Sequence, residues 1–281
     1  MLVGSAPSEL KLGTTTVTGV RRGAGLIYDS DVAAFQKASG ATQVGPILAL
    51  VDYLKAESLW DYARFYPMKS SQNTGSGSTV YGLGGLTSNN MTLVNSPTWG
   101  SDGVTFASAS SQYASSSDFL SDGDPARTVF ARCTLSGTHA DSSTRPIWAH
   151  WESISGRSTL VGYNFNDGRI SLFRATDGTP STTTRYDGSD TLFSGDICIS
   201  AQWAASTRSL WANKTSVSLV LESGTPPTST FDSSGNVTVA NIDGGGASGG
   251  DLVDMSILLI VESAALSTTQ RETITDLINA L

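Results

Sequence analysis

The chain has 281 residues, of which 39% are hydrophobic, enough to form a core and too many for a disordered chain. Charged residues make up only 15%, which argues against a long charged helical protein and suits short strands joined by tight turns. The net charge of −8 disfavours binding to nucleic acids and to anionic membrane surfaces, since both are negatively charged.

The sequence shows no segment typical of export or membrane insertion. Residues 1–13 have no apolar core of the signal-peptide kind. The longest apolar run, Met255 to Val261, is too short to span a bilayer. We therefore expect synthesis in a cytoplasm without export by the usual route.

The chain opens with a predicted β-hairpin and a short helix. Strand-forming residues 14–21 and 25–28 flank a glycine-containing turn, and this hairpin is too small to be stable alone. Ser30 can cap a helix over residues 31–39, which ends at Gly40.

A second helix is predicted from Pro46 to about Ala63. Apolar residues recur on one helical face, and Pro67 ends the pattern. The polar, glycine-rich residues 70–85 follow and are the best candidate for a linker.

Strand signals then recur to the end of the chain. The clearest hairpin joins Leu160–Phe165 to Arg169–Phe173, because Asp167 and Gly168 form a turn compatible with strand twist. Further strands are predicted at residues 129–135, 197–203, 209–217, 237–242 and 252–261. Ser267 and Gln270 form a capping-box pattern that begins a final helix.

Many strands without helices between them predict a sandwich. The predicted fold class is mainly β: an antiparallel jelly-roll sandwich with a small N-terminal hairpin, a helical region and a C-terminal helix. We expect two parts. Residues 1–75 form a docking region, and residues 76–281 form the jelly roll, the boundary falling in the linker candidate.

The two cysteines, Cys133 and Cys198, each lie inside an apolar, strand-like run. A disulfide framework uses more cysteines in a shorter chain, so we interpret both as buried thiols. One bridge stays open, since the sequence does not show whether the two strands are neighbours.

Several motifs after residue 90 resemble the laminin-G-like members of the concanavalin-A-like superfamily. Gly103–Phe106 followed by Ser111–Tyr113 is similar to the opening element of that family. Arg208–Asn213 resembles its "L-x-L-Y-V-N-G" strand, with Lys214 in place of the usual glycine, and Leu258–Gln270 resembles its closing strand. The resemblance covers roughly residues 90–281 and implies the jelly-roll fold.

The N-terminal third resembles tail-fibre and other virion proteins of bacteriophages. The matching segments are Leu12–Val17, Tyr28–Asp31 and Leu54–Trp60 with Tyr66 and Pro67. The resemblance implies a virion location and contacts with other virion proteins. A homo-oligomer is expected, most plausibly a trimer if the protein is a fibre.

Enzymatic activity is not expected. Glycoside hydrolases of this fold need two clustered carboxylates, and no glutamate here has a second acid two residues away. His139 and His150 do not form a zinc motif. Residues 244–249 fit G-x-G-x-x-G but lead into a strand instead of a helix, so they are interpreted as a loop.

No cofactor or metal is predicted. Calcium is the one open alternative, since three pairs of acidic turn residues could supply oxygen ligands. These pairs are Asp29 with Asp31, Asp122 with Asp124, and Asp187 with Asp190. None forms a complete ligand set, and turn chemistry already explains them.

The candidate carbohydrate contacts are Trp148, Trp151, Tyr186 and Asp187. An exposed aromatic ring flanked by polar groups can stack on a sugar, and Trp148 and Trp151 have His150 and Glu152 beside them. The alternative is that one tryptophan is buried and the other is a half-exposed packing residue.

Together these features favour a bacteriophage tail-fibre or host-attachment component with a glycan-binding jelly roll. The alternative hypothesis is a capsid decoration or tail adaptor protein with a purely structural role. A glycan-processing enzyme is the least supported interpretation.

Overall fold

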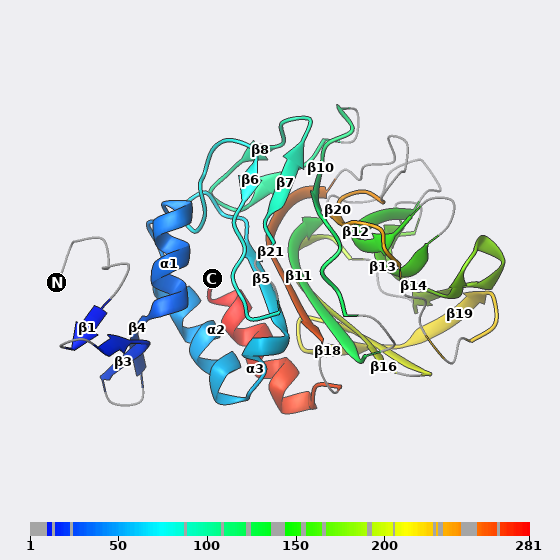
Figure 1. Cartoon of the computed structure of the whole chain (residues 1–281). Helices are drawn as coiled ribbons and strands as arrows, with labels where there is room; N and C mark the ends of the chain where they lie inside the picture. Colours follow the sequence, from blue (N-terminus) through cyan, green and yellow to red (C-terminus); the bar gives the residue numbers. More distant parts are fainter. Residues whose placement is uncertain are drawn as a thin grey trace.

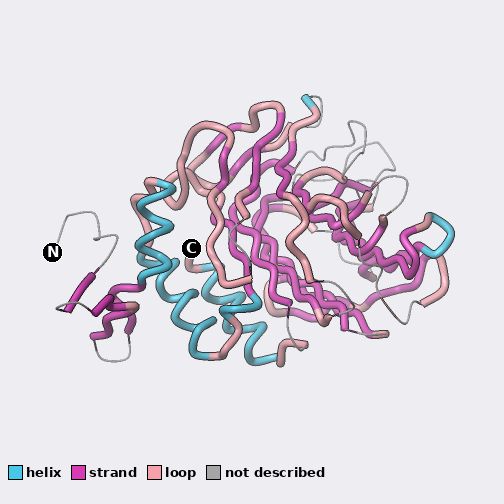
Figure 2. The backbone as a smooth tube through the Cα atoms, in the orientation of Figure 1, coloured by secondary structure: helices cyan, strands magenta, loops and turns pink. Residues whose placement is uncertain are grey.

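Two antiparallel sheets lie face to face, with helices on one outer side (Figures 1 and 2). The computed structural model describes residues 10–12, 15–22, 25–86, 89–107, 110–121, 125–135, 144–152, 156–164, 167–189, 193–204, 206–226, 229, 233–242, 252–262 and 265–281. The predicted fold class, a mainly antiparallel β-sandwich, is confirmed.

In the described residues, the first sheet has eight strands. Its last strand in the sequence, β21, pairs with β11 on one side and with β9 and β5 on the other. In spatial order the strands are β18 (Thr215–Val217), β17 (Thr207–Ala212), β16 (Gly195–Ala204), β11 (Arg127–Leu135), β21 (Leu252–Glu262), β9 (Val104–Thr105) and β8 (Thr98–Trp99), with β5 (Ala63–Pro67) beside β21.

The second sheet has nine strands within the same ranges. In spatial order they are β19 (Leu219–Ser223), β15 (Thr183–Gly188), β14 (Arg169–Gly178), β13 (Arg157–Asn164), β12 (Thr144–Trp151), β20 (Val237–Val239), β10 (Tyr113–Ser116), β7 (Met91–Val94) and β6 (Thr79–Val80). A short 3₁₀ turn, η3 (Pro180–Thr182), connects β14 to β15.

The central strands of the eight-stranded sheet are buried on both faces, which explains the long apolar run in β21. Because side chains alternate along a strand, Leu258 and Ile260 face the second sheet, whereas Ile257 and Leu259 face the helices. All four side chains have no exposed surface. A strand that is covered on both sides has a nearly continuous apolar run, as Ile257 to Val261 form here.

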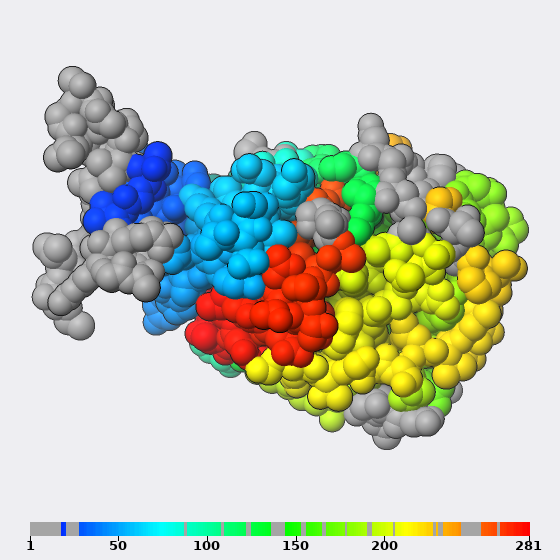
Figure 3. Space-filling view, turned by 90° about the horizontal axis from the view of Figure 1, so that it is seen from below, coloured from blue at the N-terminus to red at the C-terminus, as the bar shows by residue number. Residues whose placement is uncertain are grey.

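Within the described residues, three helices supply the outer cover, together with a 3₁₀ turn, η1 (Trp60–Tyr62). They are α1 (Ser30–Ser39), α2 (Gly45–Ala56) and α3 (Thr268–Asn279). Ile47 and Leu50 of α2 and Ile274 of α3 share a core with the outward residues of the sheet. Figure 3 shows α3, in red, beside the blue and cyan N-terminal helical region.

The helix ends follow capping chemistry, with one shift from the sequence prediction. The Asp29 carboxylate, not Ser30, caps α1 and accepts hydrogen bonds from the backbone N–H groups of Asp31 and Val32 at 2.9 and 3.2 Å. Gly40 ends α1 in the left-handed conformation, as predicted. The capping box of Ser267 and Gln270 at the start of α3 is also confirmed.

The predicted second helix was too long. Helix α2 ends at Ala56, and residues 63–67 form strand β5, which pairs with residues 257–261 of β21. All five residues of β5 are buried. A segment of this length is too short to show a periodicity that separates strand from helix.

The N-terminal hairpin is confirmed in part. Strand β3 (Gly19–Arg22) pairs with β4 (Gly25–Asp29) around the predicted turn, while β2 (Thr15–Val17) pairs with β1 (Leu10–Leu12). The single strand predicted over residues 14–21 is therefore divided between two hairpins.

Residues 70–85, predicted as a linker, are packed into the fold. The Asn73 side chain is 1% exposed, and its amide nitrogen donates to the Pro67 and Tyr81 carbonyl oxygens at 2.7 and 2.8 Å. Strand β6, which lies within this segment, pairs with β7. The side chains on both sides of the predicted boundary near residue 75 share the core beneath the helices. The two-part division predicts from the sequence that residues 76–281 fold without residues 1–75, and no observation here tests that prediction.

Both cysteines are free and buried. Cys133 faces the core between the sheets, whereas Cys198 faces the helices on the other side of the same sheet. Thiols on opposite faces of one sheet cannot form a disulfide bond.

Candidate functional site

The strands β12 to β15 place the predicted contact residues on two different faces of the nine-stranded sheet. Leu160, Phe173 and Arg185 are register partners on three neighbouring strands and therefore lie side by side on the outer face. Trp151, at the end of β12, packs with Leu160 and Phe173 in a small outer cluster. The helices cover the other sheet, so this cluster lies on the face away from them.

A cavity of about 400 Å³ lies over this cluster, and we call it the Trp151 pocket. Its lining is formed by Thr144, Pro146, Trp151, Arg157, Leu160, Phe173, Thr183, Arg185 and Ile242. The rings of Trp151 and Phe173 meet edge to face, with their centroids 6.1 Å apart.

Two arginines approach these rings. The guanidinium of Arg157 lies 5.4 Å from the Trp151 ring centroid, and that of Arg185 lies 5.7 Å from the Phe173 ring centroid. Arg157 also donates to the Thr183 hydroxyl at 3.3 Å, and its burial lowers its pKa. The pocket thus combines apolar ring surface with several hydrogen-bond donors.

Asp187 holds Arg185 in place. The Arg185 Nε and Nη2 atoms donate to the two carboxylate oxygens of Asp187 at 2.7 and 2.6 Å, and the Ser171 hydroxyl donates to the same carboxylate at 2.7 Å. A two-point arginine–carboxylate contact fixes the plane of the guanidinium. Asp187 is 3% exposed, so it acts through Arg185 and does not line the pocket.

The other candidates lie inside the sandwich. Trp148 has no exposed surface, and its ring lies 6.0 Å from the ring of Trp203 in the core. Tyr186 is 2% exposed, and the guanidinium of Arg208 lies 3.9 Å from its ring centroid. Successive side chains of a strand point to opposite faces of the sheet, so neighbouring positions are divided between the core and the outer face. Trp148 and Tyr186 face inward, and Trp151 faces outward. Among the four candidates, only Trp151 lines the pocket.

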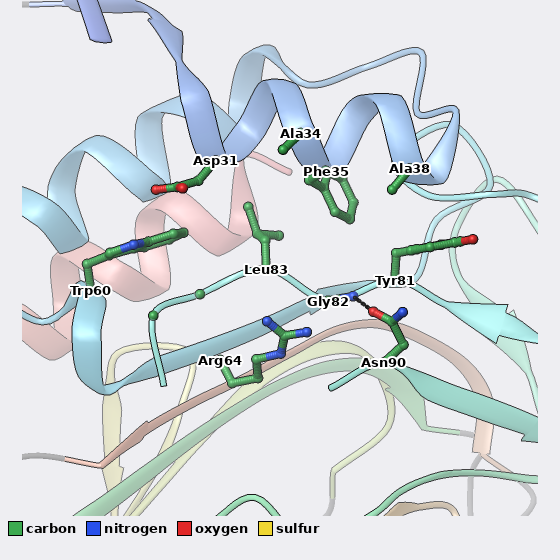
Figure 4. Close-up of a pocket in the computed structure, with 12 residues that line it drawn as sticks. Asp31, Ala34, Phe35, Ala38, Trp60, Arg64, Tyr81, Gly82, Leu83 and Asn90 are labelled. Carbon is green, nitrogen blue, oxygen red and sulfur yellow. Dashed lines mark hydrogen bonds between the residues drawn. The ribbon is translucent and has the colours of Figure 1, made fainter. Parts of the chain in front are cut away.

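A second cavity, of about 390 Å³, lies between α1 and the segment 81–85 (Figure 4). We call it the seam pocket. Its lining comes from α1 (Asp31, Ala34, Phe35, Ala38), from Trp60 and Arg64, and from residues 81–85 and 90. These residues lie far apart in the sequence, and no local motif marks them, so sequence reasoning missed this cavity.

The buried polar groups of the seam pocket are well anchored. Arg64 is 2% exposed, and its Nη2 donates to the Asn89 carbonyl oxygen. Burial lowers the pKa of Arg64. The Asn90 side-chain oxygen accepts from the Gly82 backbone N–H at 3.1 Å, which orients the amide (Figure 4).

Asp31 lies at the rim of the seam pocket and forms part of a charge cluster. Lys55 donates to Asp31 and to Asp29 at 2.6 Å each, and its ammonium lies 4.8 Å from the Trp60 ring centroid. Burial would lower the pKa of Lys55, but the two carboxylates outweigh burial and raise it. Asp29 and Asp31 therefore serve the helix cap and this cluster.

The remaining acidic pairs give no support for a calcium site. Asp187 is engaged with Arg185, while Asp122, Asp124 and Asp190 lie outside the described residues. In the ranges that the structure covers, no three His, Cys, Asp or Glu side chains gather in a way that could hold a metal ion. No helix in those ranges is long and apolar enough to cross a membrane.

No protein-family model matches the sequence, and no curated protein matches it. Solved structures do. The botulinum neurotoxin serotype D binding domain is similar over 78% of this chain and 52% of its own length, with 11% identity and a TM-score of 0.51. The receptor-binding domain of botulinum neurotoxin mosaic serotype C/D is similar over 78% of this chain and 51% of its own length, with 12% identity and a TM-score of 0.51.

The binding domain of Paraclostridial mosquitocidal protein 1 is similar over 77% of this chain and 52% of its own length, with 11% identity and a TM-score of 0.50. This chain therefore spans about half the length of each of these domains. At such identities the likeness concerns the fold alone. The chain has the β-sandwich architecture found in these binding domains.

Proposed function

We propose that the chain is a glycan-binding β-sandwich module and that the Trp151 pocket holds a sugar unit. The observation that carries this proposal is the combination of aromatic rings and arginine donors in one cavity on the face away from the helices. The similar solved structures are described as binding domains and receptor-binding domains, which supports a binding role.

The chemistry of the lining suits a sugar. A pyranose ring has an apolar face of C–H groups, which packs on apolar and aromatic surface such as Phe173 and Leu160. Its hydroxyls accept hydrogen bonds from guanidinium N–H groups such as those of Arg157 and Arg185. A cavity of about 400 Å³ falls in the range of small-molecule sites.

The proposal is binding without hydrolysis. Glycoside hydrolysis uses a pair of carboxylates across the scissile bond. The described residues that line the Trp151 pocket are instead arginines, threonines, a proline and apolar side chains. Release of reducing sugar from a bound polysaccharide by the purified protein would contradict this part of the proposal.

We further propose that this module belongs to a bacteriophage virion, as a homo-oligomeric tail-fibre or host-attachment component that is a trimer if it is a fibre. The N-terminal motifs around Leu12–Val17, Tyr28–Asp31 and Leu54–Trp60 support this role by their resemblance to virion proteins. Labelling of virions with an antibody against this chain, observed by electron microscopy, tests the location.

A second candidate, a capsid decoration or tail adaptor, has support from one edge of the nine-stranded sheet. Strand β19 lies at that edge, and its Val220 and Leu221 are 46% and 43% exposed. An exposed apolar edge strand is suited to contact another protein chain. Copy number per virion separates the two candidates, because fibres occur in few copies and decoration proteins in hundreds.

The binding proposal is tested on a glycan array with matched arginine variants. We expect wild-type protein to bind a subset of glycans and Arg157→Gln to weaken that binding at least tenfold. Arg169→Gln is the control, since Arg169 lies on β14 but outside the pocket lining and is 31% exposed. Equal binding by both variants would remove the pocket from the proposal, and absence of any glycan signal would favour the structural role.

A further inference from the structure

The seam pocket has a lining that the proposed function does not use. It lies on the side of the molecule formed by α1, η1 and β5, whereas the Trp151 pocket lies on the outer face of β12 to β15. Its walls are apolar in the middle and polar at the margins. In Figure 4, Leu83 and Phe35 lie between Trp60 at one end and Tyr81 at the other.

The cavity exists because α1 presents small side chains to it. Ala34 and Ala38, one helical turn apart, line the cavity and are exposed, while Val32, Ala33 and Phe35 of the same helix are buried. Leucine at either position would extend into a space of about 390 Å³. Packing of α1 on its neighbours therefore leaves the cavity open along this stripe.

The polar groups offer both kinds of hydrogen-bonding chemistry. Asp31, on the α1 side, carries a carboxylate that only accepts, and its side chain is 48% exposed. Arg64, across the cavity, carries a guanidinium that only donates. Asn90, next to it, has an amide that can do both. An anionic ligand would use only the donors and a cationic ligand only the acceptors.

A hydroxyl group both donates and accepts hydrogen bonds, so a polyol can pair with the donors and with the acceptors of the seam pocket. A pyranose unit carries hydroxyls around its perimeter and C–H groups on its faces, which matches polar margins around an apolar centre. The carboxylates of Asp29 and Asp31 balance the positive charges of Lys55 and Arg64, which favours an uncharged ligand. We propose that the seam pocket is a second carbohydrate site and that it binds one neutral pyranose unit.

This inference does not rest on the Trp151 pocket, and the two sites can be tested apart. The probes are glucose, galactose, mannose and N-acetylglucosamine, each titrated into the full ¹⁵N-labelled chain. The indole N–H signal of Trp60, assigned with Trp60→Phe, is the readout. We expect at least one probe to shift this signal in a saturable way, with a dissociation constant in the millimolar range.

Two substitutions fill the cavity without removing a contact. Ala34→Leu and Ala38→Leu lie on an exposed helical stripe, and leucine is a good helix former, so the fold should persist and can be checked by thermal melting. We expect either variant to weaken binding of the probe at least tenfold. Lys37→Leu, on α1 but outside the lining, and Arg157→Gln, in the other pocket, should bind it like the wild type.

The outcomes separate clearly. If no neutral probe shifts the Trp60 signal, or if Ala34→Leu binds as tightly as the wild type, the seam pocket is not a sugar site. If glucuronic acid shifts the signal and none of the neutral probes does, the assignment to an uncharged ligand is overturned. Loss of glycan-array binding in Arg157→Gln with intact Trp60 shifts would support both sites independently.

Discussion

The core shared by the two halves of the chain predicts the behaviour of fragments. A fragment of residues 76–281 lacks α1, α2 and β5. Without β5, one side of β21 loses five register partners, from Ala63 to Pro67. The sequence alone predicts that this fragment folds, but from the structure we expect that it does not fold cooperatively.

The loss of stability can be worked out from five large buried side chains that the fragment lacks. Each is at most 1% exposed; they are Ile47, Leu50, Leu54, Phe65 and Tyr66. Burial of such a side chain contributes roughly 1.5–3 kcal/mol, so together they contribute about 7–15 kcal/mol. The total stability of a domain is about 5–15 kcal/mol. The loss is therefore comparable to the whole free energy of unfolding.

The assay compares two fragments. Residues 25–281 keep the helices and β5 and are the matched control, while residues 76–281 remove them. Thermal unfolding followed by circular dichroism should give a cooperative transition for the control and a broad, weak change for the shorter fragment. A cooperative transition of residues 76–281 within a few degrees of the control would refute the shared-core argument and restore the two-part division.

Three further predictions follow from buried groups. Glu262→Gln breaks the buried contact with Arg127 and should cost about 3–5 kcal/mol in urea unfolding. Asp276→Asn breaks the exposed pair with Lys214 and should cost under ~1 kcal/mol. If the two substitutions destabilised the protein equally, burial would not explain the cost of Glu262→Gln. Burial raises the pKa of Cys198 to about 12, so a thiol reagent should react with either cysteine only after unfolding. Burial, reinforced by the positive charge of Arg127, lowers the pKa of His150 to about 3 in the folded chain. As the pH falls from 6.5 toward 3, the histidine therefore gains a proton in the unfolded chain but not in the folded one, and the stability of the protein should fall. His150→Gln should flatten part of that profile, and an unchanged profile would contradict the assignment.

Local sequence signals were sufficient where one short motif decides the structure. The Asp167–Gly168 turn predicted the pairing of β13 with β14, and the residues beside Ser267 predicted the start of α3. Strand β5 was missed because its burial depends on β21, almost two hundred residues later. No local pattern records a partner at that distance.

The candidate site shows the same limit. Trp151 was selected together with Trp148, but only the structure shows which of them faces outward, because an extra residue in β12, Ile147, and one in β13, Ser158, shift the register on the two sides of this segment. A shift of one residue moves a side chain to the opposite face of the sheet. The seam pocket depends on α1, η1 and β5 meeting in space, and periodicity in the sequence does not report that meeting.

The position of β21 also affects how the chain folds during synthesis. This strand separates β11 from β9 and β5, so both inner edges of the eight-stranded sheet stay without a partner until residue 262 has left the ribosome. Pairing across such sequence distances is slow, and open apolar edges favour association between nascent chains. Translation that stops before β21 should therefore leave a product that depends on chaperones, whatever the stability of the finished molecule.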